Sequence, residues 1–346
     1  MIKILERALV WVLLGMILVF LTWFILFARE LYSIKASFDY SVVAIEEMGK
    51  RLAIIEEERV KTTLVFVGDI MLSRAVGTKM SALDDYKYPF MKTAEFLKSA
   101  DLAFGNLETP ISSQGKNQGS IYSFRSDPRV IEGLTYSGFD VLSLANNHIW
   151  DWGATAMLDT ISLLEEAEIR PVGAGADYAK ANQPALFTLN KQKIAITAYT
   201  NLLLESLQAT SDTSGLSDFN LDKIKAVVNE LKKEENLVIV SLHWGEEYAV
   251  SSNELQRAIA RELVDAGVDI VVGHHPHVVQ ELEHYKDGWI AYSLGNFIFD
   301  QTFSEETMRG AALQVEIVGG DIVTAKLLPV EISPFFQADI NVGELP

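Results

Sequence analysis

Three of the protein's six histidines lie within four positions, in the segment GHHPH that spans residues 273–277. The apolar run before it, residues 270–272, predicts a buried strand that ends at the first glycine of this segment. Pro276 disfavours the helical region at His275, so an extended chain is expected, with His275 and His277 on the same side. Two imidazoles converging beyond a buried strand suit a borderline cation such as zinc, manganese or iron. The alternative is a polar loop with incidental histidines.

Four other predicted strands also end in polar residues that could bind a metal or take part in catalysis. They are Asp69, Asn106 with Glu108, Asn147 with His148, and His243. Ligands in α/β sheets bind beyond the carboxyl ends of the strands, so residues far apart in the sequence can meet there. A single polar residue after a strand is usually a cap or turn former. Together, however, these carboxylates, amides and imidazoles suit one or two divalent cations, such as Mn, Zn, Fe or Mg.

These strand ends belong to a series of alternating strands and helices that starts near residue 62. Strands are predicted at residues 63–67, 102–104, 141–144, 185–189, 194–199, 237–242 and 290–294. Helices are predicted at residues 91–99, 128–137, 155–167, 221–234 and 254–266, and a terminal β-hairpin turns at Gly319-Gly320. The series predicts one layered α/β domain over residues 61–346.

Residues 1–29 are predicted to form a membrane anchor. Residues 8–28 contain no charge, and as a helix they would span roughly 31 Å, the thickness of a hydrocarbon core. A cleavable signal peptide would have a shorter apolar region and a small-residue cleavage site, and neither is evident. Lys3 and Arg7 precede the run and Arg29 and Lys35 follow it, so charge alone does not give the orientation.

Residues 30–60 are predicted to form a helical stalk that could pair as a coiled coil. Apolar residues recur there in steps of three and four, at Leu31, Ile34, Phe38, Ile45, Met48, Leu52 and Ile55, with Ser41 the one polar residue. Such a seam favours a homo-oligomer. The alternative is one amphipathic helix that packs on the domain or on lipid.

Composition limits the partners. Apolar residues make up 49% of the chain, enough for a large core, and the absence of cysteine leaves any metal to His, Asn and carboxylates. Residues 1–60 carry 7 Lys/Arg and 8 Asp/Glu, whereas the remainder carries 22 and 39. This acidic balance disfavours nucleic acid as a partner.

Arg125 could clamp an anionic substrate oxygen, although an ordinary surface arginine fits equally well.

Six segments resemble, in order and spacing, the motif series of the CapA/PgsA capsule-synthesis family. They are FVGDIM at 66–71, GNLE at 105–108, LANNH at 144–148, HWG at 243–245, GHHPH at 273–277 and SLGNF at 293–297. The resemblance covers about residues 62–334. It implies a single-pass protein of the bacterial cell membrane, with an extracytoplasmic domain and other membrane subunits of poly-γ-glutamate synthesis as partners. The family is in turn similar to the calcineurin-like metallophosphoesterases, whose layered α/β sandwich surrounds two metal ions.

The parent superfamily implies a role for each strand-end residue. By position, Asp69 and His277 match ligands of one metal, Asn147, His243 and His275 match ligands of the other, and His148 matches the residue that protonates a leaving group. Asn106 or Glu108 stands where the parent has a bridging aspartate, and Met71 stands where it has a histidine ligand. A thioether is a poor ligand for such cations.

Two functions therefore remain open. One is a metal-binding subunit that takes part in capsule or poly-γ-glutamate synthesis or export. The other is a metal-dependent hydrolase of a phosphoester or amide, with His148 as general acid.

Overall fold

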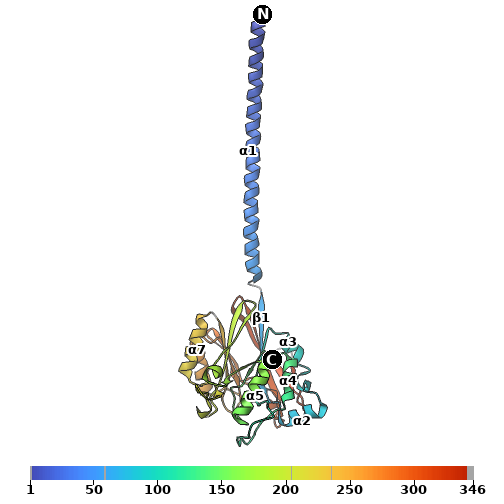
Figure 1. The fold of residues 1–346 in the computed structure, drawn as a ribbon, viewed down its shortest axis with the longest axis vertical. Coiled ribbons are helices and arrows are strands. Elements are labelled where there is room, and N and C mark those ends of the chain that lie inside the picture. Colours follow the sequence, from blue (N-terminus) through green and yellow to red (C-terminus); the bar gives the residue numbers. More distant parts are fainter. Residues whose placement is uncertain (1, 58–59, 204, 235, 341–346) are drawn as a thin grey trace. The chain divides into compact units, whose positions relative to one another are not determined.

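The computed structural model describes residues 2–57, 60–203, 205–234 and 236–340, and the chain divides into two compact units, Met1–Val60 and Lys61–Pro346. The first unit contains α1 (Ile2–Glu57), which Figure 1 shows as one unbroken helix. Its part from Trp11 to Arg51 is exposed, and it is long and apolar enough to cross a membrane. The expected seam is exposed at Phe38 and Ile45. The side chains of its last positions, Leu52 and Ile55, are not among those described. Residues 58–59 of the expected stalk lie outside the described residues.

The second unit contains two large sheets. The first has the order β16 (Ala338–Ile340), β15 (Asp321–Ile332), β14 (Arg309–Val318), β1 (Lys61–Ile70), β2 (Leu102–Leu107), β3 (Val141–Ser143) and β4 (Arg170–Val172), and β13 (Asn296–Ile298) also pairs with β1. The second has the order β11 (Leu282–Tyr285), β12 (Gly288–Ala291), β10 (Ile270–His274), β9 (Leu237–His243), β7 (Gln192–Thr200) and β6 (Ala185–Leu189). A short pair, β5 (Ala174–Gly175) and β8 (Gly215–Leu216), stands apart from both. The strands β1 to β4 are parallel, as are β7, β9, β10 and β12.

Helices cover the outer face of each sheet. One group consists of α2 (Arg74–Leu83), α3 (Ala94–Lys98), α4 (Ile131–Ser137) and α5 (Gly153–Glu166), and the other of α7 (Leu221–Lys233) and α8 (Glu254–Asp265). The short helix α6 (Tyr178–Ala181) packs on β5 and β8. Short 3-10 turns lie at η1 (Tyr88–Phe90), η2 (Pro128–Val130), η3 (Glu205–Leu207) and η4 (Glu306–Met308). In Figure 1, α7 lies on one side of the sheets and α3 and α4 lie on the other.

The core follows from the two-residue period of the strands. Along β1, Leu64 and Phe66 face the apolar layer between the two sheets, whereas Val65 and Val67 face the layer under α2 to α5. A third apolar layer lies between the second sheet and the helices α7 and α8. The predicted layered α/β sandwich is therefore confirmed, with four layers in the order helix, sheet, sheet, helix.

Most predicted elements lie within two or three residues of those observed, including the strand predicted at residues 290–294, but α2 and several short strands were not predicted. The structure has β12, which ends at Ala291, and a separate strand β13 that begins at Asn296. Gly295, with a φ of 63°, turns the chain between them. The chain thereby leaves the second sheet and pairs with β1 of the first.

Candidate metal centre

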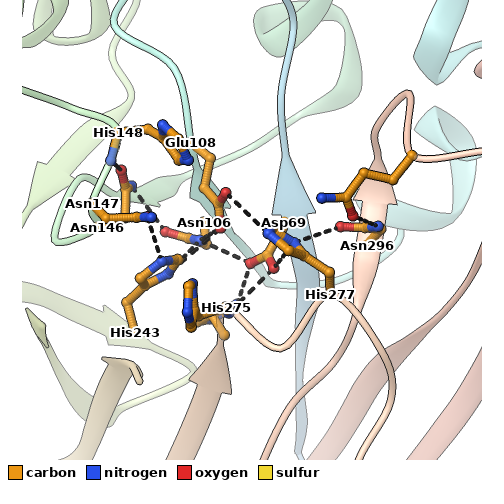
Figure 2. A network of polar contacts seen from close by, with 12 residues as sticks. Asp69, Asn106, Glu108, Asn146, Asn147, His148, His243, His275, His277 and Asn296 are labelled. Atoms are coloured by element: carbon orange, nitrogen blue, oxygen red, sulfur yellow. Dashed lines mark hydrogen bonds and ion pairs between the residues drawn. The ribbon is translucent and has the colours of Figure 1, made fainter. Parts of the chain in front are cut away.

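The polar strand ends converge between the two sheets, as Figure 2 shows. Parallel pairing sets Asp69 of β1 beside Asn106 of β2 and His243 of β9 beside His274 of β10. The strand β10 continues through Gly273, so the prediction that it ends there is wrong. Glycine is needed at this position because a Cβ would lie 1.9 Å from the carbonyl oxygen of Tyr292.

The side-chain amide of Asn106 lies at the centre of the cluster. Its Nδ2 lies 2.8 Å from Asp69 Oδ1, 3.1 Å from Glu108 Oε1 and 3.2 Å from His243 Nδ1. Its Oδ1 accepts from Asn146 Nδ2, which fixes the amide with the nitrogen facing the other three groups. An NH₂ group donates and cannot ligate a cation. Between the two alternatives left open by the sequence, Glu108 is thus the one that presents ligand atoms, and Asn106 positions them.

Glu108 is fully buried, and one of its oxygens, Oε2, has no hydrogen-bond partner within the described residues. Burial, together with the negative charge of Asp69, raises the pKa of Glu108 well above its usual value. A buried carboxylate beside a second carboxylate is costly unless a cation offsets it. The geometry therefore fits a divalent ion at this position.

Asp69 itself is held in its charged form. Burial opposes ionisation, but contacts with His274 and His277 outweigh it and hold the pKa of Asp69 well below its usual value. His274 Nδ1 lies 3.3 Å from Asp69 Oδ1, and His277 Nδ1 lies 3.1 Å from Asp69 Oδ2. His274 is completely buried next to this carboxylate.

His243 is oriented so that its neutral imidazole offers the lone pair of one ring nitrogen to the cluster. Its Nε2 lies 2.9 Å from Asn147 Oδ1, so the proton belongs on Nε2 and the lone pair of Nδ1 faces Asn106 and Glu108. Burial, followed by the charge of His275, lowers the pKa of His243 well below its usual value. An imidazole that stays neutral at pH 7 is ready to ligate a metal. Asn147, predicted as a ligand, contacts this histidine through the oxygen it would offer.

The turn at His275 and His277 differs from the extended chain that was predicted. Both residues are in the left-handed region, with φ of 95° and 59°, and the ring centroids are 5.8 Å apart. Two hydrogen bonds hold this strained turn: His275 N donates to Asp69 Oδ2, and Tyr248 N donates to Pro276 O. The two rings lie close together, as expected, but a turn brings them there and not an extended strand.

The two rings of this turn differ in their partners. His275 Nδ1 is buried without a hydrogen-bond partner, and burial, together with the charge of His277, lowers the pKa of His275 to about 4. His277 Nδ1 lies 3.0 Å from Asn296 Oδ1, while Asn296 Nδ2 donates to Gln301 and to Thr307 O. Because Asn296 Oδ1 must accept, His277 carries its proton on Nδ1 and leaves Nε2 free to ligate.

His148, the predicted general acid, lies at the edge of the cluster with a partner of its own. Its Nδ1 lies 2.8 Å from Asp151 Oδ2, and its ring stacks on Phe124 with centroids 3.9 Å apart. Asp151 also accepts a hydrogen bond from Phe124 N, so this one carboxylate holds both the His148 ring and the backbone of Phe124 in place. The arrangement leaves Nε2 of His148 free to carry a proton to a bound group.

Arg125, predicted to bind an anionic substrate, packs on the loop from which it comes. Its guanidinium lies 3.5 Å from the centroid of the Trp152 ring, and Nη1 donates to Gln114 O. Its role toward a substrate stays a prediction.

Among the residues that the structure describes, two groups of three side chains bring their ligand atoms within 4.8 Å of one another: Asp69 with Glu108 and His243, and Glu247 with His275 and His277. The parent superfamily implied another division, with His243 and His275 at one ion. Glu247 was missed because it lies in an irregular loop, where periodicity gives no signal. Its distance of four residues from His243 was the only hint.

Three other residues of the cluster were also missed as site residues. Asn146 accepts from the backbone of His148 and Ile149, Asp151 orients His148, and Asn296 orients His277. The motif segments quoted for the resemblance already contain Asn146 and Asn296. These two amides position ligands and do not present free atoms of their own.

Comparisons with known proteins agree with the motif series. Residues 63–301 match the profile described as bacterial capsule synthesis protein PGA_cap. The capsule biosynthesis protein CapA of Bacillus anthracis is 33% identical over 283 residues, which cover 80% of this chain and 68% of that protein. The PGA biosynthesis protein CapA of Bacillus subtilis (strain 168) is 32% identical over 285 residues, which cover 81% of this chain and 74% of that protein.

Among solved structures, the NAD nucleotidase NadN of Haemophilus influenzae superposes with a TM-score of 0.47 and 13% identity. The superposition covers 82% of this chain and 54% of that chain, so this chain matches about half its length.

Proposed function

Because the chain belongs to the bacterial capsule synthesis protein family PGA_cap, we propose that it takes part in synthesis or export of a poly-γ-glutamate-type capsule polymer. In this proposal, α1 anchors the chain in the bacterial cell membrane as a single pass. The unit Lys61–Pro346 lies outside the cytoplasm, where it would work with other membrane subunits of capsule synthesis.

The observation that carries the proposed metal-dependent role is the set of buried polar atoms without partners. Glu108 Oε2 and His275 Nδ1 are buried and unpaired within the described residues, on side chains from opposite sheets. Buried polar groups are nearly always paired, so such atoms at one place imply a ligand. Carboxylate and imidazole ligands together fit a borderline divalent cation.

A cation bound there would supply Lewis acidity toward an anionic oxygen of the substrate. The chain's own residues would do the rest. Asn106 and Asn296 hold the ligand side chains, and burial keeps His243 and His275 neutral at pH 7. In a strongly acidic domain, the cation would also provide the positive charge that a carboxylate-bearing polymer needs.

The second candidate function, a metal-dependent hydrolase, is favoured by the pair of His148 and Asp151. A histidine whose Nδ1 is fixed by a carboxylate has the arrangement of a general acid. With Nε2 directed to a bound ester or amide, His148 would deliver the proton to the leaving group. The scaffold of a non-catalytic subunit does not require this pair.

The test is metal analysis of the full chain purified in detergent, with hydrolysis of a phosphodiester and of a γ-glutamyl amide assayed alongside. We expect bound metal in the wild type and in His284→Ala, an exposed control, and a loss of metal in His243→Ala. Metal with turnover that disappears in His148→Ala would favour the hydrolase, and metal without turnover would favour the assembly role. No metal in any form would refute both.

A further inference from the structure

The loop after β9 brings an exposed carboxylate to the His275–His277 turn. Tyr248 N donates to Pro276 O at 2.8 Å, and Trp244 N donates to His274 O at 3.1 Å, so the loop is docked on the turn at both ends. Tyr248 also lies with its ring 6.2 Å from that of His277. Glu247 lies between these anchors, and a ligand oxygen of its carboxylate falls within 4.8 Å of ligand nitrogens of both His275 and His277.

We infer that Glu247, His275 and His277 hold one borderline divalent cation, Zn²⁺, Mn²⁺ or Fe²⁺, at the open side of the cluster. A separate ion would be held by Asp69, Glu108 and His243. This inference rests on the proposed metal-dependent function, and it assigns a ligand that the motif series does not contain.

The two histidines have the free atoms that such a centre needs. His275 is 7% exposed, and its Nδ1 has no hydrogen-bond partner within the described residues. His277 is 2% exposed and has Nδ1 committed to Asn296, so Nε2, which lies 4.0 Å from Glu108 Oε2, carries the lone pair that could ligate a cation. An unpaired nitrogen on a buried ring costs free energy unless a ligand engages it.

Glu247 completes a set of two imidazoles and one carboxylate. Catalytic zinc sites commonly use three protein ligands of this kind and leave the fourth position open. In a tetrahedral site with bonds of about 2.0–2.1 Å, ligand atoms stand about 3.4 Å apart. The ligand atoms lie within 4.8 Å of one another, and an exposed glutamate side chain can close the site by changing rotamer.

Met71 cannot supply the third ligand. Its side chain is completely buried in the core under α2, and its sulfur accepts from Ser73 N at 3.2 Å and from Ser73 Oγ at 3.0 Å. Its sulfur is thus already engaged by Ser73. A carboxylate from another loop therefore supplies the third ligand of this ion.

The experiment compares metal stoichiometry and affinity in Glu247→Gln with those in Glu246→Gln. Glu246 is the exposed neighbour in the same loop, so its variant is matched in charge and location. The full chain in detergent is stripped with a chelator and titrated with Mn²⁺ or Zn²⁺. Bound metal is measured by elemental analysis, and the fold is checked by thermal unfolding. Spectra of the Co²⁺-loaded protein report on the coordination of each ion.

We expect two ions per chain in the wild type and in Glu246→Gln. In Glu247→Gln we expect one ion to bind at least tenfold more weakly, with loss of its Co²⁺ bands, while the other is retained. In His243→Ala the opposite ion should be lost. Two ions of unchanged affinity in Glu247→Gln would overturn the assignment. So would a single wild-type ion that depends on His243 but not on Glu247. Absence of metal from every form would instead refute the proposed function from which the assignment starts.

Discussion

Glu108→Gln should stabilise the metal-free protein, and it should gain less stability than the wild type when metal binds. The wild-type carboxyl is completely buried beside Asp69, and its Oε2 has no hydrogen-bond partner within the described residues. Its pKa is raised well above the usual value by burial and by the charge of Asp69. Glutamine has nearly the same shape as glutamate and carries no charge. The substitution therefore removes the repulsion from the Asp69 carboxylate and keeps the packing around the side chain.

The sign of the pH dependence follows from the raised pKa. A carboxyl group whose pKa rises on folding favours the folded state most below its unfolded pKa, about 4.3, and loses this contribution as the pH rises through the folded value. Metal-free wild type should therefore lose stability between pH 5 and pH 8 relative to Glu108→Gln. The difference at pH 8 should be about 1–3 kcal/mol, the cost of a buried group without a partner. This corresponds to roughly 2–12 °C in Tm.

Metal should reduce the advantage of the variant over the wild type. A cation at 100 times its Kd stabilises the folded state by about 2.7 kcal/mol. If loss of the charged ligand weakens metal binding tenfold, about 1.4 kcal/mol of this stabilisation is lost. We expect saturating Mn²⁺ to raise Tm of the wild type by more than it raises that of the variant.

The assay is thermal unfolding followed by near-UV circular dichroism, at pH 5 and pH 8, with chelator and with Mn²⁺. Glu246→Gln, in which an exposed carboxyl is removed, should gain as much stability from Mn²⁺ as the wild type does. A metal-free Glu108→Gln that is less stable than wild type at both pH values would refute the reasoning. It would mean that Glu108 stabilises the fold by contacts of its own and does not await a cation.

Three further predictions concern residues around the same site and the N-terminal helix. Asn296→Ala removes the acceptor that fixes His277 and should weaken metal binding about 10–100-fold in calorimetric titrations; unchanged affinity would show that Asn296 does not orient the ligand. If the hydrolase function holds, Asp151→Asn should lower kcat about 10²–10⁴-fold with little change in KM; an unchanged kcat would exclude this pair from catalysis. Phe38→Glu places a charge on the exposed seam of α1 and should convert an oligomer to a monomer in sedimentation; a wild type that already sediments as a monomer would refute the coiled coil.

The sequence was enough to locate most of the cluster because its strands are short, apolar and parallel. The runs before Asp69, Asn106 and His243 fix where each strand ends, and parallel strands bring their ends to one edge. The same reasoning could not find Glu247, because a loop residue is positioned by hydrogen bonds from distant backbone and not by its own periodicity. The docking of Tyr248 N on Pro276 O is such a contact.

Local rules failed where tertiary contacts were stronger. Pro276 favours an extended residue before it, yet His275 has a φ of 95° because Asp69, on another sheet, accepts its backbone N–H. Gly273 was taken as a strand end, but it lies within β10 because the backbone of Tyr292 passes too close for any side chain. Both deviations occur beside the candidate ligands. Strain and close backbone approach are typical of functional sites, where surrounding contacts maintain conformations that the local sequence disfavours.

The charge of the domain connects the two candidate functions. Residues 61–346 carry 22 Lys/Arg against 39 Asp/Glu, and a γ-glutamyl polymer carries a free carboxylate on each unit. Under the proposed function, such a polymer would be repelled over most of the surface, so its recognition would have to be local and driven by a positive centre. Arg125 does not provide it as arranged, because its guanidinium packs on Trp152. Cations held by Glu108, His243 and their neighbours would provide it, whether the polymer is only bound or also cleaved. The assembly role and the hydrolase therefore share the same requirement for metal, and they differ in whether a proton from His148 reaches a leaving group.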